Sequence, residues 1–158
     1  MTSQIECHTL FVNYGYRARE IITPCKIGQP CPGKRQFVPY PQEFRAVWDT
    51  GATETTITEG LAKKLGLYKI NEVMVSGVTG SAICSTYLIA LSLPNGIVIP
   101  EIEVADCVGS IGCDVLVGMD VIGMGDFAVC NVGGNTTFTF RVPSVGVVDF
   151  TSASAPVT

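Results

Sequence analysis

Asp49 is the residue of this chain whose setting most suggests chemistry. It ends an apolar strand predicted over Phe44–Asp49, and Thr50 and Gly51 follow it. Burying a carboxylate at the end of such a strand is costly unless the carboxylate is used. Gly51 allows a sharp turn that presents backbone amides to the carboxylate, and the Thr50 hydroxyl can brace that turn. These three residues alone leave a choice between an ordinary Asx turn and a catalytic carboxylate.

Two glycine-containing segments lie downstream of this turn. A strand predicted over Val115–Val117 ends at Gly118, and residues 77–80 have the composition of a hairpin turn. Together with the Asp-Thr-Gly-Ala sequence, these segments resemble the retropepsin-like aspartic proteases, in particular their bacterial single-domain members. The resemblance extends from about Phe44 to Pro143 and includes the Thr-Ile-Thr and Leu-Ala-Lys-Lys-Leu-Gly sequences after the turn and the Leu-Val-Gly motif that ends at Gly118.

The resemblance implies an all-β fold, namely a closed acid-protease barrel with one or two short helices. It also implies that Asp49, Thr50 and Gly51 form a catalytic turn, of which the chain has one copy. A two-lobed pepsin needs a second copy, so the active site is expected to form in a homodimer, with one Asp49 from each chain at the two-fold axis. The two carboxylates would share a proton and activate a water molecule against a peptide carbonyl, a reaction that requires no cofactor and no metal.

The same resemblance predicts that a peptide or protein substrate binds in an extended form between the barrel and a flap hairpin. Side chains alternate along the Phe44–Asp49 strand, which places Val47 on the face of the Asp49 carboxylate and Trp48 in the core. Glycines at the hairpin tip would make it mobile, and its backbone amides would face the substrate. The residues predicted to contact substrate are Val47, Ala52, Thr53, Gly77, Val78, Thr79, Gly80, Leu116 and Val117.

The chain departs from the viral members of the family at two positions. After the Asp-Thr-Gly-Ala motif those members carry acidic residues, one of which pairs with an Arg behind the second motif. This chain has Thr53 and Met119 at those places, so we expect the dimer to be held in another way and to be weak. Asp114 and Asp120 flank the second motif outside any Asp-Thr-Gly turn, and Asp120 is expected to cap the short helix that follows.

The rest of the chain has the pattern of short strands joined by Gly- and Pro-containing turns. Strands are predicted at residues 8–14, 19–27, 44–49, 72–78, 81–93, 97–105, 115–117, 127–131, 136–142 and 146–150. One helix is predicted over Glu59–Leu65, with Thr58 as its N-cap and Gly66 at its end, and a second over Met119–Ile122.

We expect one domain with three parts. Residues 1–43 supply N-terminal strands and a Pro- and Gly-rich insertion, residues 44–150 form the retropepsin-like core, and residues 151–158 form a flexible tail. By analogy with related dimers, Cys7–Val12 and Val145–Phe150 are candidates for a sheet between subunits.

Composition excludes several other functions. The 158 residues are 47% hydrophobic and 15% charged, with a net charge of -4, which predicts a globular domain without a basic surface for nucleic acid or a membrane. His8 is the single histidine, which argues against Ser-His-Asp chemistry and against zinc sites built on several imidazoles. Seven cysteines show no disulfide framework, and no signal peptide is visible, so we predict free thiols in a cytoplasmic protein. That the protein is bacterial is implied by the resemblance to bacterial family members alone.

Two rival functions remain to be considered: nucleotide binding and a catalytically silent module. Residues 123–128 fit a loose Gly-x-Gly-x-x-Ala pattern, but no strand-turn-helix surrounds them, so nucleotide binding is not expected. The stronger rival is a catalytically silent retropepsin-like module for dimerisation or peptide binding. The intact Asp49-Thr50-Gly51 turn favours a homodimeric aspartic endopeptidase, because a silent domain gains little from burying a pair of carboxylates.

Overall fold

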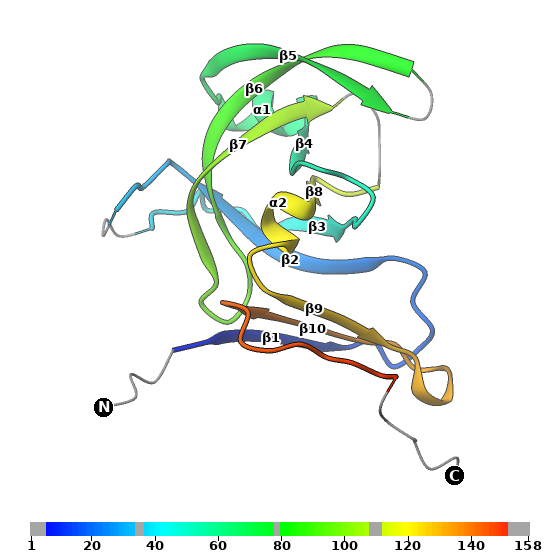
Figure 1. Cartoon of the computed structure of the whole chain (residues 1–158). Coiled ribbons are helices and arrows are strands. Elements are labelled where there is room, and N and C mark those ends of the chain that lie inside the picture. The colour runs from blue at the N-terminus through cyan, green and yellow to red at the C-terminus, as the bar shows by residue number, and fades with distance from the viewer. Residues whose placement is uncertain (1–5, 34–36, 78–79, 108–111, 152–158) are drawn as a thin grey trace.

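The computed structural model describes residues 6–33, 37–77, 80–107 and 112–151, and their fold is all-β, as predicted. Figure 1 shows a barrel-like body above a smaller sheet. The strands are β1 His8–Asn13, β2 Ile21–Gly28, β3 Phe44–Trp48, β4 Thr56–Thr58, β5 Lys69–Gly77, β6 Gly80–Ser92, β7 Val98–Cys107, β8 Val115–Val117, β9 Asp126–Cys130 and β10 Thr137–Val142. The helices are α1 Glu59–Leu65 and α2 Met119–Ile122, with a short 3-10 turn, η1, at Val132–Gly134.

The larger sheet closes on itself. Its order is β2-β3-β8-β4-β7-β6-β5, and β2 also pairs with β6. The six strands β2, β3, β8, β4, β7 and β6 therefore form a closed barrel. β5 lies outside that closure and pairs with β6 as one arm of a long hairpin. The two strands that carry the sequence motifs, β3 and β8, are parallel neighbours inside the barrel, with Val47 opposite Leu116.

The smaller sheet has the order β1-β10-β9 and packs its inner face against the barrel. Trp48 is a central contact between the two layers, since its ring centroid lies 4.9 Å from those of both Phe138 and Phe140. Its indole nitrogen donates to the buried Thr23 hydroxyl at 3.0 Å. The predicted core position of Trp48 is confirmed. Its packing on β10 holds the end of β3 against the smaller sheet.

Helix α1 has the predicted boundaries because both of its ends carry local signals. The Thr58 hydroxyl accepts from the Leu61 amide at 3.2 Å, which is an N-cap bond. Gly66 ends the helix with φ 61°, a left-handed conformation that favours glycine.

The chain ends differ from the predictions. β1 pairs with β10 of the same chain over its whole length, so this N-terminal strand is already used within the subunit. The strand predicted at residues 146–150 is wrong for the single chain, because residues 144–149 follow β10 without strand or helix structure. This segment leaves Val147, Val148 and Phe150 strongly exposed, with Val147 at 95%. Most of the predicted tail, residues 152–158, lies outside the described residues.

Candidate active site

The Asp49 turn begins directly after β3. The Asp49 amide donates to the Val117 carbonyl of β8 at 3.0 Å, which fixes the start of the turn. Gly51 N donates to the Asp49 carboxylate Oδ1 at 2.8 Å, and Ala52 N donates to the Asp49 carbonyl at 3.2 Å. The carboxylate is half-buried, whereas Thr50 and Gly51 are exposed. The turn therefore presents its carboxylate and its hydroxyl on an open face of the single subunit.

The loop after this turn is tied to the start of α2 by backbone hydrogen bonds. Met119 N donates to the Ala52 carbonyl at 2.8 Å, and Asp120 N donates to the Thr53 carbonyl at 3.1 Å. The two sequence motifs are thus joined at this point, because the segment behind the second motif holds the loop behind the first. Ala52 and Thr53 act through their carbonyls here, and their predicted contact with substrate stays a prediction.

Thr55 and Asp120 strengthen this junction with side chains. Thr55 is fully buried; its hydroxyl donates to Asp120 Oδ1 at 2.7 Å and accepts from Gly118 N at 3.1 Å. Thr55 N donates to Asp120 Oδ2 at 2.9 Å. Thr55 was not among the residues predicted for this site. Its only sequence signal is that a threonine follows shortly after Asp-Thr-Gly.

Asp120 was expected to cap α2, but it is not the N-cap of that helix. The N-cap of α2 is Gly118, which forms no side-chain cap bond. Asp120 lies inside the first turn of α2, where its carboxylate accepts from Val121 N at 2.9 Å and from both Thr55 donors. The Asp120 carboxylate therefore serves two segments at once: the first turn of α2 through Val121 N, and the loop after Asp49 through Thr55.

Gly118 is required by the close approach of the two segments. A Cβ at this position would lie 2.5 Å from the carbonyl carbon and oxygen of Glu54. Real Cβ atoms do not approach backbone so closely, so any larger residue would push the loop away from β8. The glycine of the second motif therefore lets the loop after Asp49 pack against it.

An open pocket of about 530 Å³ lies beside the Asp49 carboxylate. It brings together three residues predicted from the sequence, Val47, Asp49 and Leu116, together with part of Trp48. Arg19, Glu20 and Ile21 complete its wall. These three were not predicted as site residues, because they reach the site only through the antiparallel register of β2 on β3, in which Ile21 lies opposite Trp48.

Val117 was also predicted to contact substrate, and that contact stays a prediction. Its side chain is fully buried in the core and does not line the pocket. Side chains alternate between the two faces of a strand, so the exposure of Leu116 on one face places Val117 on the other. Only the Val117 carbonyl reaches the site, where it accepts from Asp49 N.

The predicted flap corresponds to the β5–β6 hairpin. Gly77 lies opposite Gly80, and the adjacent Ser76 and Ser81 hydroxyls lie 2.8 Å apart. Val78 and Thr79, the other two predicted flap residues, lie outside the described residues. In Figure 1 the free end of this hairpin and the end of β3 lie on the same side of the molecule.

Comparison with known proteins identifies the family of the chain. A family model described as aspartyl protease matches residues 34–121, which include the Asp49 turn, the hairpin and the Gly118 motif. The chain belongs to the aspartyl protease family. Comparison with curated protein sequences gives no match.

A solved structure shows the fold of this aspartyl protease family member. It is similar to the crystal structure of a retropepsin-like aspartic protease from Rickettsia conorii, with a TM-score of 0.58 and 12% identity over 90% of this chain and 98% of that one. It also matches the solution structure of the Simian Foamy Virus (mac) protease, with a TM-score of 0.44 and 16% identity over 65% of this chain and 92% of that one. The first match shows that the fold is retropepsin-like.

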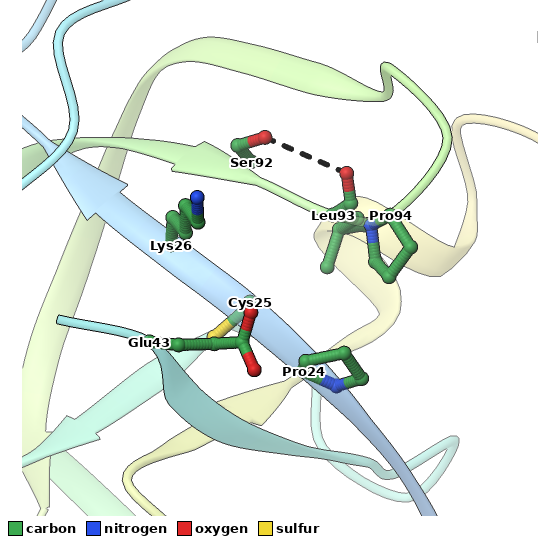
Figure 2. Close-up of a pocket in the computed structure, with 7 residues that line it drawn as sticks. All are labelled: Pro24, Cys25, Lys26, Glu43, Ser92, Leu93 and Pro94. Atoms are coloured by element: carbon green, nitrogen blue, oxygen red, sulfur yellow. Dashed lines mark hydrogen bonds between the residues drawn. The ribbon is translucent and has the colours of Figure 1, made fainter.

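Figure 2 shows a second pocket of this family member, of about 280 Å³, which Asp49 does not line. Its lining residues are Pro24, Cys25, Lys26, Glu43, Ser92, Leu93 and Pro94. Burial raises the pKa of the Cys25 thiol to about 12, and the nearby Asp114 carboxylate adds to the rise. The thiol therefore stays protonated at physiological pH and is no nucleophile.

Disulfides, metal-binding clusters and membrane-spanning helices can each be checked in the described part of the structure. The cysteines whose side chains are described, Cys7, Cys25, Cys31, Cys84, Cys113 and Cys130, are free. No group of three or more His, Cys, Asp or Glu side chains comes together there. Within the same residues, no helix has the length and apolar character needed to span a bilayer.

Proposed function

We propose that the protein is a homodimeric aspartic endopeptidase that cleaves extended peptide segments. The observation that carries this proposal is the Asp49-Thr50-Gly51 turn, held by β8 and α2 beside an open pocket. One chain supplies one such carboxylate, and it lies on an accessible face. A second copy related by a two-fold axis would bring its own Asp49 to the first, and the two Thr50 hydroxyls would bond across the axis.

The reaction follows from two carboxylates that share one proton. The ionised Asp49 accepts a proton from a bound water, whose oxygen forms a bond to the carbon of the scissile carbonyl. The protonated Asp49 of the other chain donates its proton to the peptide nitrogen as the bond from carbon to nitrogen breaks. The products are a carboxylic acid and an amine, and the protons balance without a cofactor.

The substrate would lie between the barrel and the β5–β6 hairpin. Val47 and Leu116 offer an apolar wall beside Asp49, where a side chain next to the scissile bond would pack. Gly77, Val78, Thr79 and Gly80 would cover it from the hairpin, and Ala52 and Thr53 would contact it from the loop. An extended peptide suits such a site because it adds backbone hydrogen bonds to strand edges.

A bacterial cytoplasmic location is part of the same proposal. Free thiols among the described cysteines fit a reducing compartment. The net charge of -4 supports a peptide rather than a nucleic acid or an anionic membrane as the partner.

The test is cleavage of an unfolded protein by the wild type and by Asp49→Asn. The substitution keeps the size of the side chain and removes its charge, so we expect activity to fall at least about a thousandfold, the scale of a lost catalytic group. Asp114→Asn is the matched control and is expected to stay active, because Asp114 lies outside the turn and accepts from Arg45 N. Peptide binding by the wild type without any cleavage would support the silent module instead.

A further inference from the structure

Asp106 is a buried carboxylate that lies outside the Asp49 turn. It is on β7, near the end of that strand, and is 8% exposed. Its Oδ1 accepts from Ser85 N at 2.6 Å, and its Oδ2 accepts from the Tyr87 hydroxyl at 2.9 Å. Both donors belong to β6, so this one side chain holds two points of the neighbouring strand.

The position of Asp106 in the sheet explains why a side chain makes these bonds. β6 and β7 pair as far as Thr86 opposite Ala105, where their ladder ends. From Ser85 to Gly80, β6 pairs with β5 alone and leaves the barrel as an arm of the hairpin. Where the ladder would continue, the Asp106 carboxylate takes the Ser85 amide. It therefore fixes β6 at the residue where the hairpin begins.

The same residue connects the hairpin root to the catalytic loop. The Asp106 backbone lies opposite Ile57 of β4, the strand that directly follows the Asp49–Thr55 loop. Ile57 is almost fully buried, as is Tyr87, so the connection runs through packed core. A buried carboxylate is tolerated because two hydrogen bonds satisfy it.

Tyr87 is suited to be a lasting donor in this contact. Burial raises the pKa of its hydroxyl, and the hydrogen bond to Asp106 raises that pKa further. The hydroxyl therefore keeps its proton across the working range of a protease.

We propose that Asp106 is a positioning residue that fixes the root of the β5–β6 hairpin and so sets how the hairpin closes on a peptide above Asp49. The part about closure rests on the proposed function, because it treats the hairpin as the flap. The part about the root rests on the contacts alone. Two measurements separate these parts.

The first measurement is amide hydrogen exchange on the full chain. We expect Asp106→Ala to raise exchange in Ser81–Ser85 by about tenfold, the effect of one lost charge-assisted bond, and to leave β2 and β3 unchanged. Asp106→Asn is expected to restore slow exchange, because its amide oxygen still accepts from Ser85 N. Equal acceleration in all strands, or none in the hairpin, would overturn the role of Asp106 at the root.

The second measurement is the kinetics of peptide cleavage. Asp106→Ala is expected to raise KM by about tenfold with a smaller change in kcat, and Asp106→Asn to return KM toward the wild type. Tyr87→Phe removes one of the two bonds and should give an intermediate KM, which keeps the test open if Asp106→Ala does not fold. Unchanged KM in all variants, with a looser hairpin, would overturn the role in closure.

A matched control lies in the same stretch of β6. Thr86 is buried, and its hydroxyl has no hydrogen-bond partner among the described residues. Thr86→Val should leave both exchange and KM unchanged. If the wild type cleaves no peptide at all, the proposed function fails, and the exchange data still decide whether Asp106 holds the hairpin root.

Discussion

At the scale of single residues, Thr55 and Thr86 show how much a buried hydroxyl depends on its partners. The Thr55 hydroxyl joins Asp120 to Gly118 N, whereas the Thr86 hydroxyl has no partner among the described residues. We predict that Thr55→Val lowers the free energy of unfolding by about 1–3 kcal/mol, because the buried Gly118 amide loses its acceptor and Asp120 loses one of its donors. Urea denaturation followed by tryptophan fluorescence measures it.

Thr86→Val provides the comparison for this prediction. It removes a buried hydroxyl that makes no bond, so the free energy of unfolding should stay the same or rise slightly. Equal losses in the two variants would mean that the contact between Thr55 and Asp120 adds nothing to stability.

The Asp49 turn and part of its pocket, Val47 and Leu116, could be predicted from the sequence, while the wall supplied from the start of β2 could not. Asp49, Thr50 and Gly51 are consecutive, so the turn and its bond from Gly51 N to the carboxylate follow from local chemistry. Arg19 and Ile21 reach the same pocket through the pairing of β2 with β3. A sequence does not state which strands pair, so long-range neighbours of this kind remain hidden.

At the scale of elements, Gly118 sets the distance between β8 and the loop after Asp49. We predict that Gly118→Ala lowers the free energy of unfolding by roughly 2 kcal/mol or more, because its Cβ would lie 2.5 Å from Glu54 backbone atoms. It should also reduce cleavage, since the loop that carries Asp49 must move. Thermal unfolding and initial rates on the same samples measure both effects.

Gly60→Ala is the opposite case and serves as the control. Gly60 lies in α1, and a Cβ there would have no neighbour within 4 Å. Alanine favours a helix more than glycine does, so this variant should gain about 0.5–1 kcal/mol. A stable, active Gly118→Ala protein would show that the close approach to Glu54 does not constrain the loop.

Elements with local end signals were predicted best. Helix α1 was predicted with its exact caps, because Thr58 and Gly66 mark its ends. β4 was not predicted as a strand, because its three residues are too short for a pattern and depend on β7 and β8. The strand at residues 146–150 was predicted from apolar residues, but a strand also needs a paired neighbour, and this segment has none in the described chain.

At the scale of the whole molecule, Asp126 anchors the segment after β10. Its carboxylate accepts from Arg141 Nε at 2.9 Å, from Val145 N at 3.2 Å and from the Ser144 hydroxyl. The Ser144 bond first, and then Arg141, hold the pKa of Asp126 below its ordinary value of 3.8. A carboxylate whose pKa is lower in the folded state stabilises the fold above its unfolded-state pKa, and this contribution is lost as the pH falls through the folded value.

We therefore predict that stability declines below about pH 4 partly through Asp126. Asp126→Asn should be less stable than the wild type near neutral pH and should show a shallower acid decline. Glu101→Gln, which removes another exposed carboxylate, should keep the wild-type profile. Unfolding midpoints measured from about pH 2 to about pH 7 give the pH dependence of stability on both sides of that pKa. Parallel curves for the wild type and Asp126→Asn would contradict a contribution of Asp126 to the acid decline.

The last prediction concerns assembly. If each subunit holds half of the active site, specific activity must depend on protein concentration. Thr53 and Met119 are exposed and uncharged, so a contact between subunits could not use an ion pair at these two positions. The segment after β10, which Asp126 anchors, is a candidate for this contact, because Val147, Val148 and Phe150 are exposed at 95%, 63% and 73%. An apolar segment of this kind gains stability when a second chain covers it.

We expect specific activity to fall on dilution through the dimer dissociation constant, measured in parallel by sedimentation. Val147→Asp should weaken the dimer by about tenfold or more and shift the activity curve to higher concentration, because it places a charge in an apolar contact. Val132→Asp alters another exposed valine, outside this segment, and should leave both curves unchanged. Constant specific activity far below the dissociation constant would show that one chain is sufficient for catalysis.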